Sequence, residues 1–359
     1  MKNEETTTGM RVPLKDAQKM RKYLSEKDMI RNDLRLGKDE KYVYFPIKGT
    51  SNNLRPNNII NRTFKKKETK PTTYKDIASV PEGLKHELPT SYDVIGDIAL
   101  IKLPKTLLKY QKEIGEALLK SNKNIKTVCL VEPVSGEFRT RNIKILAGEK
   151  RTKTTHIEYG LTFNTDVKNT YFSPRLAAER KRIAGLVKND EVVVDMFAGV
   201  APFSIMIAKY ANPKIIYAID KNLDAVKYAK ENIKKNNVLD KIEVIHADAK
   251  EVESIFNQKC VKASRVIMNL PFSAHLFFQY VLKVTDSYSI VHYYDILNKD
   301  NMKNRVNLLR KIAKKEKISL TNLDVRKIKT YSPREFYIGI DITAQKSADV
   351  AQPSRAADL

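Results

Sequence analysis

In the second half of the chain, apolar residues form unbroken runs rather than alternating with polar ones. Three valines at 192–194 are followed by Asp195, a loop of small residues at 197–202 and an apolar helix predicted over 203–208. An unbroken apolar run predicts a parallel strand covered on both faces, and open α/β sheets bind ligands at the carboxyl ends of such strands. The pattern therefore predicts the first strand, loop and helix of a nucleotide-type cofactor site.

The same pattern recurs further along the chain. Strands are predicted at 214–220, 238–248 and 265–271, with a helix at 222–236. The first two end in acids, Asp220 and Asp248, and the third ends in Asn269-Leu270-Pro271. Asp220 can accept hydrogen bonds from ribose hydroxyls, and Asp248 suits an adenine amino group. Each acid alone could cap a helix, but their recurrence at successive strand ends favours a ligand site.

The loop after Asp195 indicates the kind of cofactor. A dinucleotide site needs G-x-G-x-x-G, whereas this loop has Gly199 alone and lacks the lysine of a P-loop. Pro202 suits the first turn of a helix, where its missing N–H costs nothing. The loop resembles motif I of class I S-adenosylmethionine (SAM) methyltransferases, with an ordinary strand-to-helix turn as the alternative. The predicted cofactor-binding residues are Asp195, Phe197, Gly199, Val200, Pro202, Asp220, Lys221, Asp248, Ala249 and Asn269.

The remaining patterns divide the chain into five parts. Residues 1–9 are polar and expected to be frayed, while a helix at 12–28 and a strand at 42–47 predict a small α/β module. Strands at 91–103, 127–131 and 143–148, a helix at 107–119 and a hairpin at 154–167 predict an α+β middle domain. The predicted parts are the N-terminal module 1–50, a linker with a basic patch 51–90, the middle domain 91–168, the catalytic domain 169–344 and a disordered tail 345–359.

The catalytic part has the sequence of an α/β protein with a Rossmann-like, mostly parallel sheet. Beyond the four strands above, it has predicted helices at 274–284 and 301–316 and strands at 289–295, 324–328 and 336–342. These complete the seven-stranded sheet of a class I methyltransferase, with a final antiparallel pair. Segment 171–183, YFSPRLAAERKRI, predicts a helix capped by Ser173 with Pro174 at its first position. Arg175 and Glu179 share one face of that helix, where an i,i+4 ion pair is the ordinary expectation.

Charge and composition narrow the class of partner. The 359 residues include 66 Lys+Arg against 42 Asp+Glu, a formal net charge of +24. Such a balance attracts polyanions and favours nucleic acid, although lysine-rich composition also accompanies growth at high temperature. Two cysteines and five scattered histidines predict neither a disulfide framework nor a metal site. No apolar run reaches the roughly 18 residues of a membrane span and the N-terminus is unlike a signal peptide, so a cytoplasmic protein is expected.

Four segments carry a family resemblance. They are GEFRTRNIKILAGEKRT at 136–152, YFSPRLAAERKRI at 171–183, VVVDMFAGVAPFSI at 192–205 and VIMNLP at 266–271, with HYY at 292–294 and YSPRE at 331–335 in agreement. Together they resemble the archaeal–eukaryotic tRNA (guanine-37-N1)-methyltransferase family over about residues 90–342. The resemblance implies a small N-terminal domain, a middle domain and a SAM-binding catalytic domain. It also implies tRNA as the partner, gripped at its anticodon loop and body, with no obligate protein partner and a monomeric enzyme.

The resemblance also assigns roles. N1 of guanine carries a proton, so methyl transfer needs that proton removed and the reactants aligned in line. Glu179 matches the family's general base, and Arg151 matches the residue that would donate to O6 as charge develops there. Asn269 would hold the edge of the base, Pro271 would fix the turn, and Tyr171 would line the methyl donor and the extruded base. The predicted tRNA-binding residues are Arg139, Arg141, Arg151, Arg175, Arg180 and Phe272.

One position departs from the family pattern. Where the family often has N-L-P-K, this chain has Phe272. Some archaeal members of the family also methylate C7 of the tricyclic base 4-demethylwyosine at the same nucleotide, which gives isowyosine. We hypothesise from the sequence that Phe272 makes room for, or stacks on, such a base. Packing of Phe272 on the helix that follows is the alternative.

Three other functions compete with this interpretation. Wyosine-pathway aminocarboxypropyl transferases share the fold and cofactor, but the resemblance implies that they lack the N-x-P that this chain has at 269–271. An rRNA or protein methyltransferase with an N-P-P-Y-type motif is disfavoured by the N-terminal and middle segments. A non-catalytic tRNA-binding protein with a relic cofactor fold is disfavoured by the intact Asp195, Asp220 and Asp248.

Overall fold

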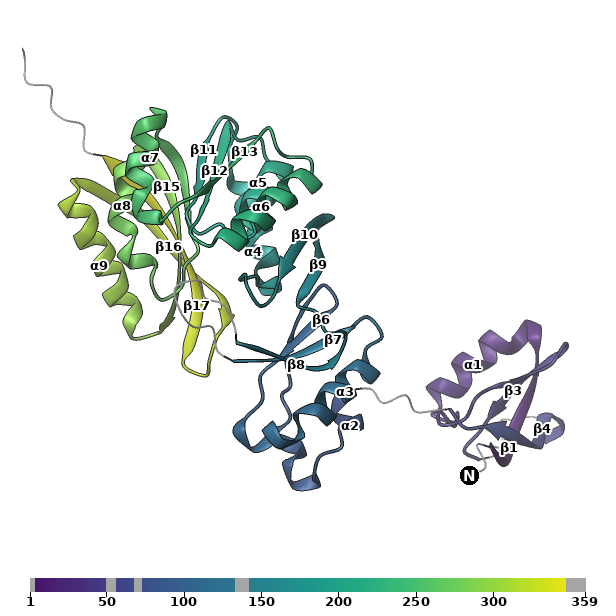
Figure 1. The fold of residues 1–359 in the computed structure, drawn as a ribbon. Coiled ribbons are helices and arrows are strands. Elements are labelled where there is room, and N and C mark those ends of the chain that lie inside the picture. Colours follow the sequence, from purple (N-terminus) through teal and green to yellow (C-terminus); the bar gives the residue numbers. More distant parts are fainter. Residues whose placement is uncertain (1–3, 50–55, 68–72, 133–141, 347–359) are drawn as a thin grey trace, which may run out of the picture. The chain divides into compact units, whose positions relative to one another are not determined.

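The computed structural model describes residues 4–49, 56–67, 73–132 and 142–346 (Figure 1). The chain forms two compact units, residues 1–77 and 78–359. Within the described ranges, no helix is both long and apolar enough to cross a membrane. Most of the predicted tail at 345–359 lies outside these residues, and its first two residues continue the last strand.

The first unit is a four-stranded sheet with one long helix. Its strands run in the order β2 (Gly37–Lys38), β3 (Tyr42–Pro46), β1 (Glu4–Pro13) and β4 (Ile59–Lys65), and helix α1 spans Ala17–Glu26. Two predictions are wrong here. The supposedly frayed start is β1, and part of the supposed linker 51–90 is β4, which pairs with β1 from Glu4↔Lys65 to Met10↔Ile59. The threonines of β1 are β-branched and favour a strand, but they lack the apolar signal by which the other strands were predicted.

The second unit begins with a smaller mixed sheet. Its strands run in the order β5 (Asp93–Ile95), β6 (Ile98–Ile101), β7 (Thr127–Val131) and β8 (Ile143–Gly148). Helix α3 (Gln111–Ser121) packs on β7 and β8. Strands β9 (Lys153–Glu158) and β10 (Leu161–Asp166) form a hairpin, as predicted, and a turn at Gly96-Asp97 divides the strand predicted at 91–103 into β5 and β6. Two 3-10 segments, Glu82–Glu87 and Lys105–Tyr110, complete the elements before β7, whereas the short helix α2 (Tyr74–Ile77) ends the first unit.

The seven-stranded sheet of the second unit confirms the predicted class I methyltransferase fold. Its order is β13 (Ile242–His246), β12 (Ile215–Asp220), β11 (Val192–Asp195), β14 (Ala263–Met268), β15 (Thr285–Asn298), β17 (Glu335–Lys346) and β16 (Ile318–Thr330). Strands β11 to β15 pair in parallel, and β17 runs antiparallel to both of its neighbours. The last three strands are longer than predicted, because their outer ends are polar.

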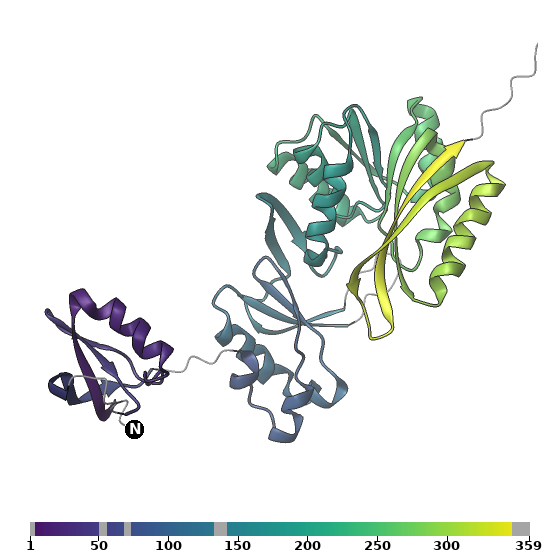
Figure 2. The same ribbon diagram turned by 180° about the vertical axis from the view of Figure 1, so that it is seen from behind.

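Helices cover both faces of this sheet (Figures 1 and 2). One face carries α4 (Ala177–Leu186), α5 (Pro202–Tyr210) and α6 (Leu223–Lys235), and the other carries α7 (Val252–Lys259), α8 (Phe278–Val284) and α9 (Asn301–Lys315). Each face buries its own apolar cluster, with Ile205 and Ile233 in one and Phe256 and Leu309 in the other. The strand order reverses its direction between β11 and β14, and ligands bind at such a switch point in open α/β sheets.

Candidate active site

A cavity of about 490 Å³ opens at the carboxyl ends of β11, β12 and β14. That volume lies within the range of small-ligand sites. Many predicted site residues line this cavity: Tyr171, Arg180, Phe197, Gly199, Pro202, Asp220, Lys221, Asp248, Ala249, Asn269, Pro271 and Phe272. Residues separated by about a hundred positions in the sequence are therefore brought to one site.

The loop between β11 and α5 is folded tightly against Asp220. Gly199 has a φ of +56°, and its N–H donates to Asp220 Oδ2 at 2.6 Å. A Cβ at this position would lie 3.5 Å from the carbonyl oxygen of Tyr171, so the backbone itself forms part of the wall. Ala201 is also left-handed, at φ +65°, and Pro202 begins α5 as predicted. The loop thus places backbone N–H groups, rather than side chains, beside the second strand end.

Two carboxylates, those of Asp220 and Asp248, line the cavity. Asp220 also accepts from the N–H of Asn222 at 2.9 Å, and burial raises the pKa of Asp220 above its ordinary value. Burial acts in the same direction on Asp248, but the N–H of Lys250 and the ammonium of Lys221 outweigh it, so the pKa of Asp248 lies below its usual range. Each carboxylate oxygen has a second lone pair, so both residues can still accept from a ligand.

Two predicted cofactor contacts are not in the cavity wall. Asp195 is 1% exposed and accepts from the Ser204 hydroxyl at 2.9 Å, and burial raises the pKa of Asp195 to about 7. Val200 is fully buried in the apolar cluster beneath α5, where its carbonyl accepts from Asn232 at 3.2 Å. Both residues support the loop from below, so the structure does not support their prediction as cofactor contacts.

The opposite wall is formed by residues 269–272. Tyr337 donates to the side-chain oxygen of Asn269, which leaves the amide NH₂ of Asn269 available to a ligand. Phe272 has a φ of +72°, an unfavourable value for a bulky residue. Its N–H donates to Asp295 Oδ1 at 2.9 Å, and Asp295 is fully buried. The Phe272 ring is 43% exposed and meets Tyr331 edge-on at 5.7 Å, a ring contact with the β16–β17 loop rather than with the following helix.

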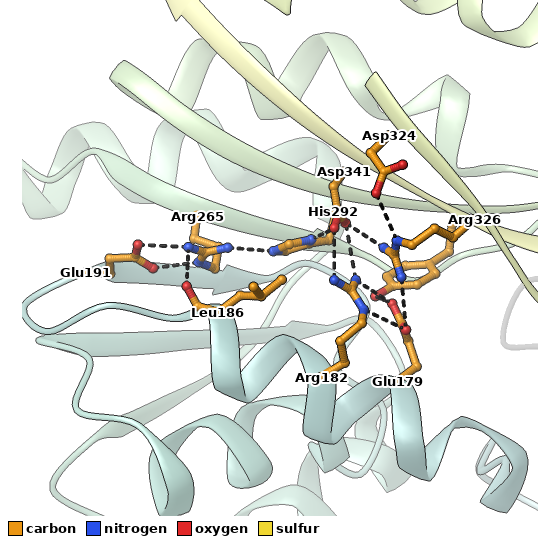
Figure 3. Close-up of polar contacts among 10 residues, drawn as sticks. Glu179, Arg182, Leu186, Glu191, Arg265, His292, Asp324, Arg326 and Asp341 are labelled. Atoms are coloured by element: carbon orange, nitrogen blue, oxygen red, sulfur yellow. Dashed lines mark hydrogen bonds and ion pairs between the residues drawn. The ribbon is translucent and has the colours of Figure 1, made fainter. Parts of the chain in front are cut away.

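Glu179 does not line the cavity. It is 7% exposed, and Arg182 donates to both of its oxygens, at 2.9 and 2.7 Å (Figure 3). Tyr294 donates to Oε1 at 2.9 Å, and an Arg326 nitrogen lies 3.4 Å from Oε2. Burial favours the neutral acid, but the two guanidinium groups and the Tyr294 hydroxyl outweigh it, so the pKa of Glu179 lies below its ordinary value. Glu179 is therefore an ionised carboxylate one side chain behind the wall.

The predicted ion pair between Arg175 and Glu179 is wrong. Arg175 lies in the 3-10 turn Pro174–Leu176 that precedes α4, so the four-residue spacing of an α-helix does not apply to it. Its guanidinium instead pairs with Asp93 of β5 at 2.5 Å. Ser173 occupies the cap position and Pro174 the first position, as predicted, but the Ser173 side chain makes no cap hydrogen bond.

The predicted RNA-binding arginines are mostly engaged within the protein. Arg180 reaches the cavity wall but is 1% exposed and makes two hydrogen bonds with Glu158, at 2.7 and 2.5 Å, so the structure does not support its prediction as a tRNA contact. Arg151 lines a second hollow beside Lys153 instead of the cavity, and it pairs with Asp97 at 2.5 Å. This position does not support donation to O6 by Arg151. Arg139 and Arg141 lie outside the described residues.

Sequence reasoning missed residues that hold the site together. Asp295 lies inside β15 but is the last residue of the strand predicted at 289–295, so the rule of an acid at a predicted strand end could have singled it out. Tyr337 and Asp341 lie on β17, where a simple alternating pattern gave no sign of polar contacts across the sheet. Arg182 stands three residues after Glu179, at a spacing that predicts a contact on a helix.

Known proteins match this chain along nearly its whole length. Models for a tRNA methyltransferase 5 N-terminal domain, a TYW2 N-terminal domain and a TRM5/TYW2 methyltransferase domain match residues 9–55, 75–152 and 154–321. The tRNA (guanine(37)-N(1))-methyltransferase Trm5b of Pyrococcus abyssi is 37% identical over 341 residues, which cover 93% of this chain and 98% of that protein. The chain belongs to the TRM5/TYW2 methyltransferase family.

Both branches of the TRM5/TYW2 family are among its relatives. A tRNA(Phe) (4-demethylwyosine(37)-C(7)) aminocarboxypropyltransferase of Methanocaldococcus jannaschii is 37% identical over 251 residues, covering 70% of this chain and 96% of that protein. A solved complex of aTrm5 and tRNALeu superposes with a TM-score of 0.79 at 35% identity, covering 93% of this chain and 99% of that one. The family resemblance and the fold expected from the sequence are confirmed.

Proposed function

We propose that this protein transfers a methyl group from SAM to N1 of guanosine 37 in tRNA. The observation that carries the proposal is the match to Trm5b over 93% of the chain, compared with 70% for the aminocarboxypropyltransferase relative. The wall formed by Asn269, Leu270 and Pro271 beside Tyr171 supports it, because this is the motif expected for methyl transfer. Aminocarboxypropyl transfer to the same nucleotide is the second candidate, and its relatives favour it only over the shorter region.

The cavity fits SAM. Asp220 can accept from the ribose hydroxyls and Asp248 from the adenine amino group, while Phe197 and Phe277 supply an apolar face. SAM, when bound, supplies the electrophilic methyl group. The chain's own part is to hold the reactants in line and to exclude water.

The guanine would enter on the Asn269 side. Because Tyr337 occupies the Asn269 oxygen, the Asn269 amide NH₂ can donate to guanine O6, where negative charge develops as N1 loses its proton. The rings of Phe272 and Tyr331 offer flat surfaces to an extruded base. This assigns to Asn269 the donation to O6 that the sequence assigned to Arg151.

Glu179 is the proposed general base. Among the described residues, the carboxylates in the cavity wall are Asp220 and Asp248, which face the cofactor. Glu179 is joined to the target side through Tyr294, whose ring packs on Phe203 of the wall at 5.8 Å. A turn of the Glu179 side chain past Phe203 would let it take the N1 proton, which frees the N1 lone pair for attack on the methyl carbon.

The RNA partner follows from charge as well as family. A net charge of +24 favours phosphate contacts, and aTrm5 has been solved in complex with tRNALeu. Cytoplasmic location and action as a monomer belong to the same proposal.

Nucleoside analysis tests the proposed reaction. We expect tRNA incubated with the protein and SAM to gain 1-methylguanosine at position 37, detected by mass spectrometry after digestion. A tRNA with guanosine 37 replaced by adenosine is the control and should gain nothing. Transfer of an aminocarboxypropyl group, or no modification although SAM and tRNA bind, would overturn the proposal.

The Asp220→Ala variant tests the cofactor site. We expect SAM to bind about 10- to 100-fold more weakly, because a charged acceptor for the ribose is lost and the Gly199 N–H loses its partner. Titration calorimetry measures the change. Asp224→Ala, which removes an exposed carboxylate on α6, should bind SAM as the parent does. Equal affinity of the Asp220 variant would remove this residue from the site.

Phe272 is the residue proposed to contact a second substrate, 4-demethylwyosine. We propose that its ring also supports methylation of C7 of 4-demethylwyosine at position 37. Phe272→Ala should reduce C7 methylation about tenfold, the rough value of one aromatic stacking contact, and N1 methylation less. Product ratios on tRNA that carries either base measure the effect. Absence of C7 methylation by the parent protein would end this part of the proposal.

A further inference from the structure

A partly buried chain of charged side chains runs between α4 and the sheet, from Glu191 to Glu179 (Figure 3). At its centre is Asp341 of β17, a residue that no motif singled out. Arg182 Nη1 lies 3.0 Å from Asp341 Oδ2, and Arg326 Nη2 lies 3.0 Å from Asp341 Oδ1. The same two guanidinium groups contact Glu179. Asp341 and Glu179 therefore share both cations.

His292 fixes the other side of Asp341. Arg265 can only donate, so the 2.7 Å contact from its Nη1 makes His292 Nε2 an acceptor. The His292 proton then lies on Nδ1 and is donated to Asp341 Oδ1 at 2.6 Å. Burial lowers the pKa of His292, so the ring stays neutral and adds no charge to the group. Arg265 is balanced separately by Glu191 at 2.5 Å.

The shared group is electrically balanced. Arg182 and Arg326 carry two positive charges, and Glu179 and Asp341 carry two negative charges. When Glu179 takes a proton, its charge is lost and both guanidinium groups remain. Asp341, 21% exposed, is then the partly buried anion that still balances them, since Asp324, the further carboxylate at Arg326, is 69% exposed. An unbalanced cation is unfavourable in such a place, because charges largely removed from water need partners.

We propose that Asp341 is a positioning residue for methyl transfer: it is the permanent counter-ion of Arg182 and Arg326 while Glu179 accepts the N1 proton. The inference rests on the proposed function, because it needs Glu179 as the base. Asp341 does not line the cavity that would hold SAM and the guanine, and it acts on Glu179 through the two guanidinium groups. The proton moves from guanine N1 to a Glu179 oxygen, and Asp341 keeps its charge throughout.

The Asp341→Asn variant tests the idea. Asn keeps the shape and an oxygen acceptor for His292, but it removes the charge. We expect the single-turnover rate to fall about tenfold, with KM for tRNA and SAM unchanged, because Glu179 becomes a weaker base beside two uncompensated cations. Asp341→Glu should recover part of the rate. Asp324→Asn, which neutralises the exposed carboxylate on the same Arg326, should leave the rate unchanged.

The double variant separates positioning from folding. If Asp341 acts through Glu179, Asp341→Asn should have no further effect on the rate of Glu179→Gln. An equal tenfold loss in both backgrounds, or a full rate for Asp341→Asn, would overturn the inference. A parent protein without methyl transfer, or a fully active Glu179→Gln, would instead refute the proposed function. Thermal unfolding and SAM titration of each variant test whether the fold is retained. A lower thermal stability or a lower SAM affinity of Asp341→Asn would assign Asp341 a purely structural role.

Discussion

Glu179→Gln should lower turnover about 10²- to 10⁴-fold and leave SAM affinity nearly unchanged. Gln keeps the size of the side chain and can still accept from the Tyr294 hydroxyl, but it cannot take a proton from N1. Asp220, Asp248 and the Gly199 loop are untouched, so cofactor binding is expected to persist. Single-turnover kinetics on tRNA and titration of SAM measure the two quantities separately.

The low pKa of Glu179 predicts the pH dependence of turnover, and the Glu243→Gln variant provides a control. Because the pKa of Glu179 lies below its ordinary value, its carboxylate is ionised throughout the neutral range. Protonation of Glu179 should therefore cause no loss of rate between about pH 6 and pH 8. Glu243→Gln, which changes an exposed carboxylate on β13, should react as the parent does. Full turnover by Glu179→Gln at neutral pH would show that another group, or water, takes the proton.

Arg180→Met should lower the free energy of unfolding by about 3–5 kcal/mol. The Arg180 and Glu158 side chains are 1% and 3% exposed, so removal of the cation leaves a buried carboxylate without its partner. Arg180 also donates to the carbonyl of Ser173, which joins α4 to the residue before the 3-10 turn Pro174–Leu176. Urea unfolding measures the loss, and tRNA affinity of the remaining folded protein should change little.

A second ion pair serves as the comparison. Arg175→Met breaks a partly exposed pair with Asp93 and should cost no more than about 1 kcal/mol. The double variant Arg180→Met with Glu158→Leu should recover stability relative to Arg180→Met, because no buried charge remains. If Arg180→Met were as stable as the parent and bound tRNA poorly, the tRNA-binding role predicted from the sequence would be supported.

The sheet and its cofactor end could be predicted because their signals are local. Each buried strand is an apolar run, and an acid or Asn269 follows directly. Parallel strands in one sheet then bring these ends together, as the cavity lining of Asp220, Asp248 and Asn269 shows. Strand β1 was missed because its threonines, although β-branched, do not form the apolar run by which the other strands were predicted.

The partners of the charged residues could not be predicted in the same way. Arg180 finds Glu158 on a hairpin 22 positions earlier, and Glu179 finds Arg326 147 positions later. Composition treats every arginine as a candidate for phosphate, whereas burial decides which ones are available. A family resemblance can predict the role of a residue. It cannot predict which side chains lie near that residue, because those contacts depend on the packing of distant segments.

Because the charged chain between α4 and the sheet is partly buried, its ion pairs respond to salt differently from the charges on the protein surface. Dissolved ions screen exposed charges over about 8 Å at physiological ionic strength, but they act much less on buried pairs. A change in salt concentration should therefore alter the affinity of exposed lysines and arginines for RNA phosphates. The electrostatic environment of Glu179, the proton acceptor, should change much less.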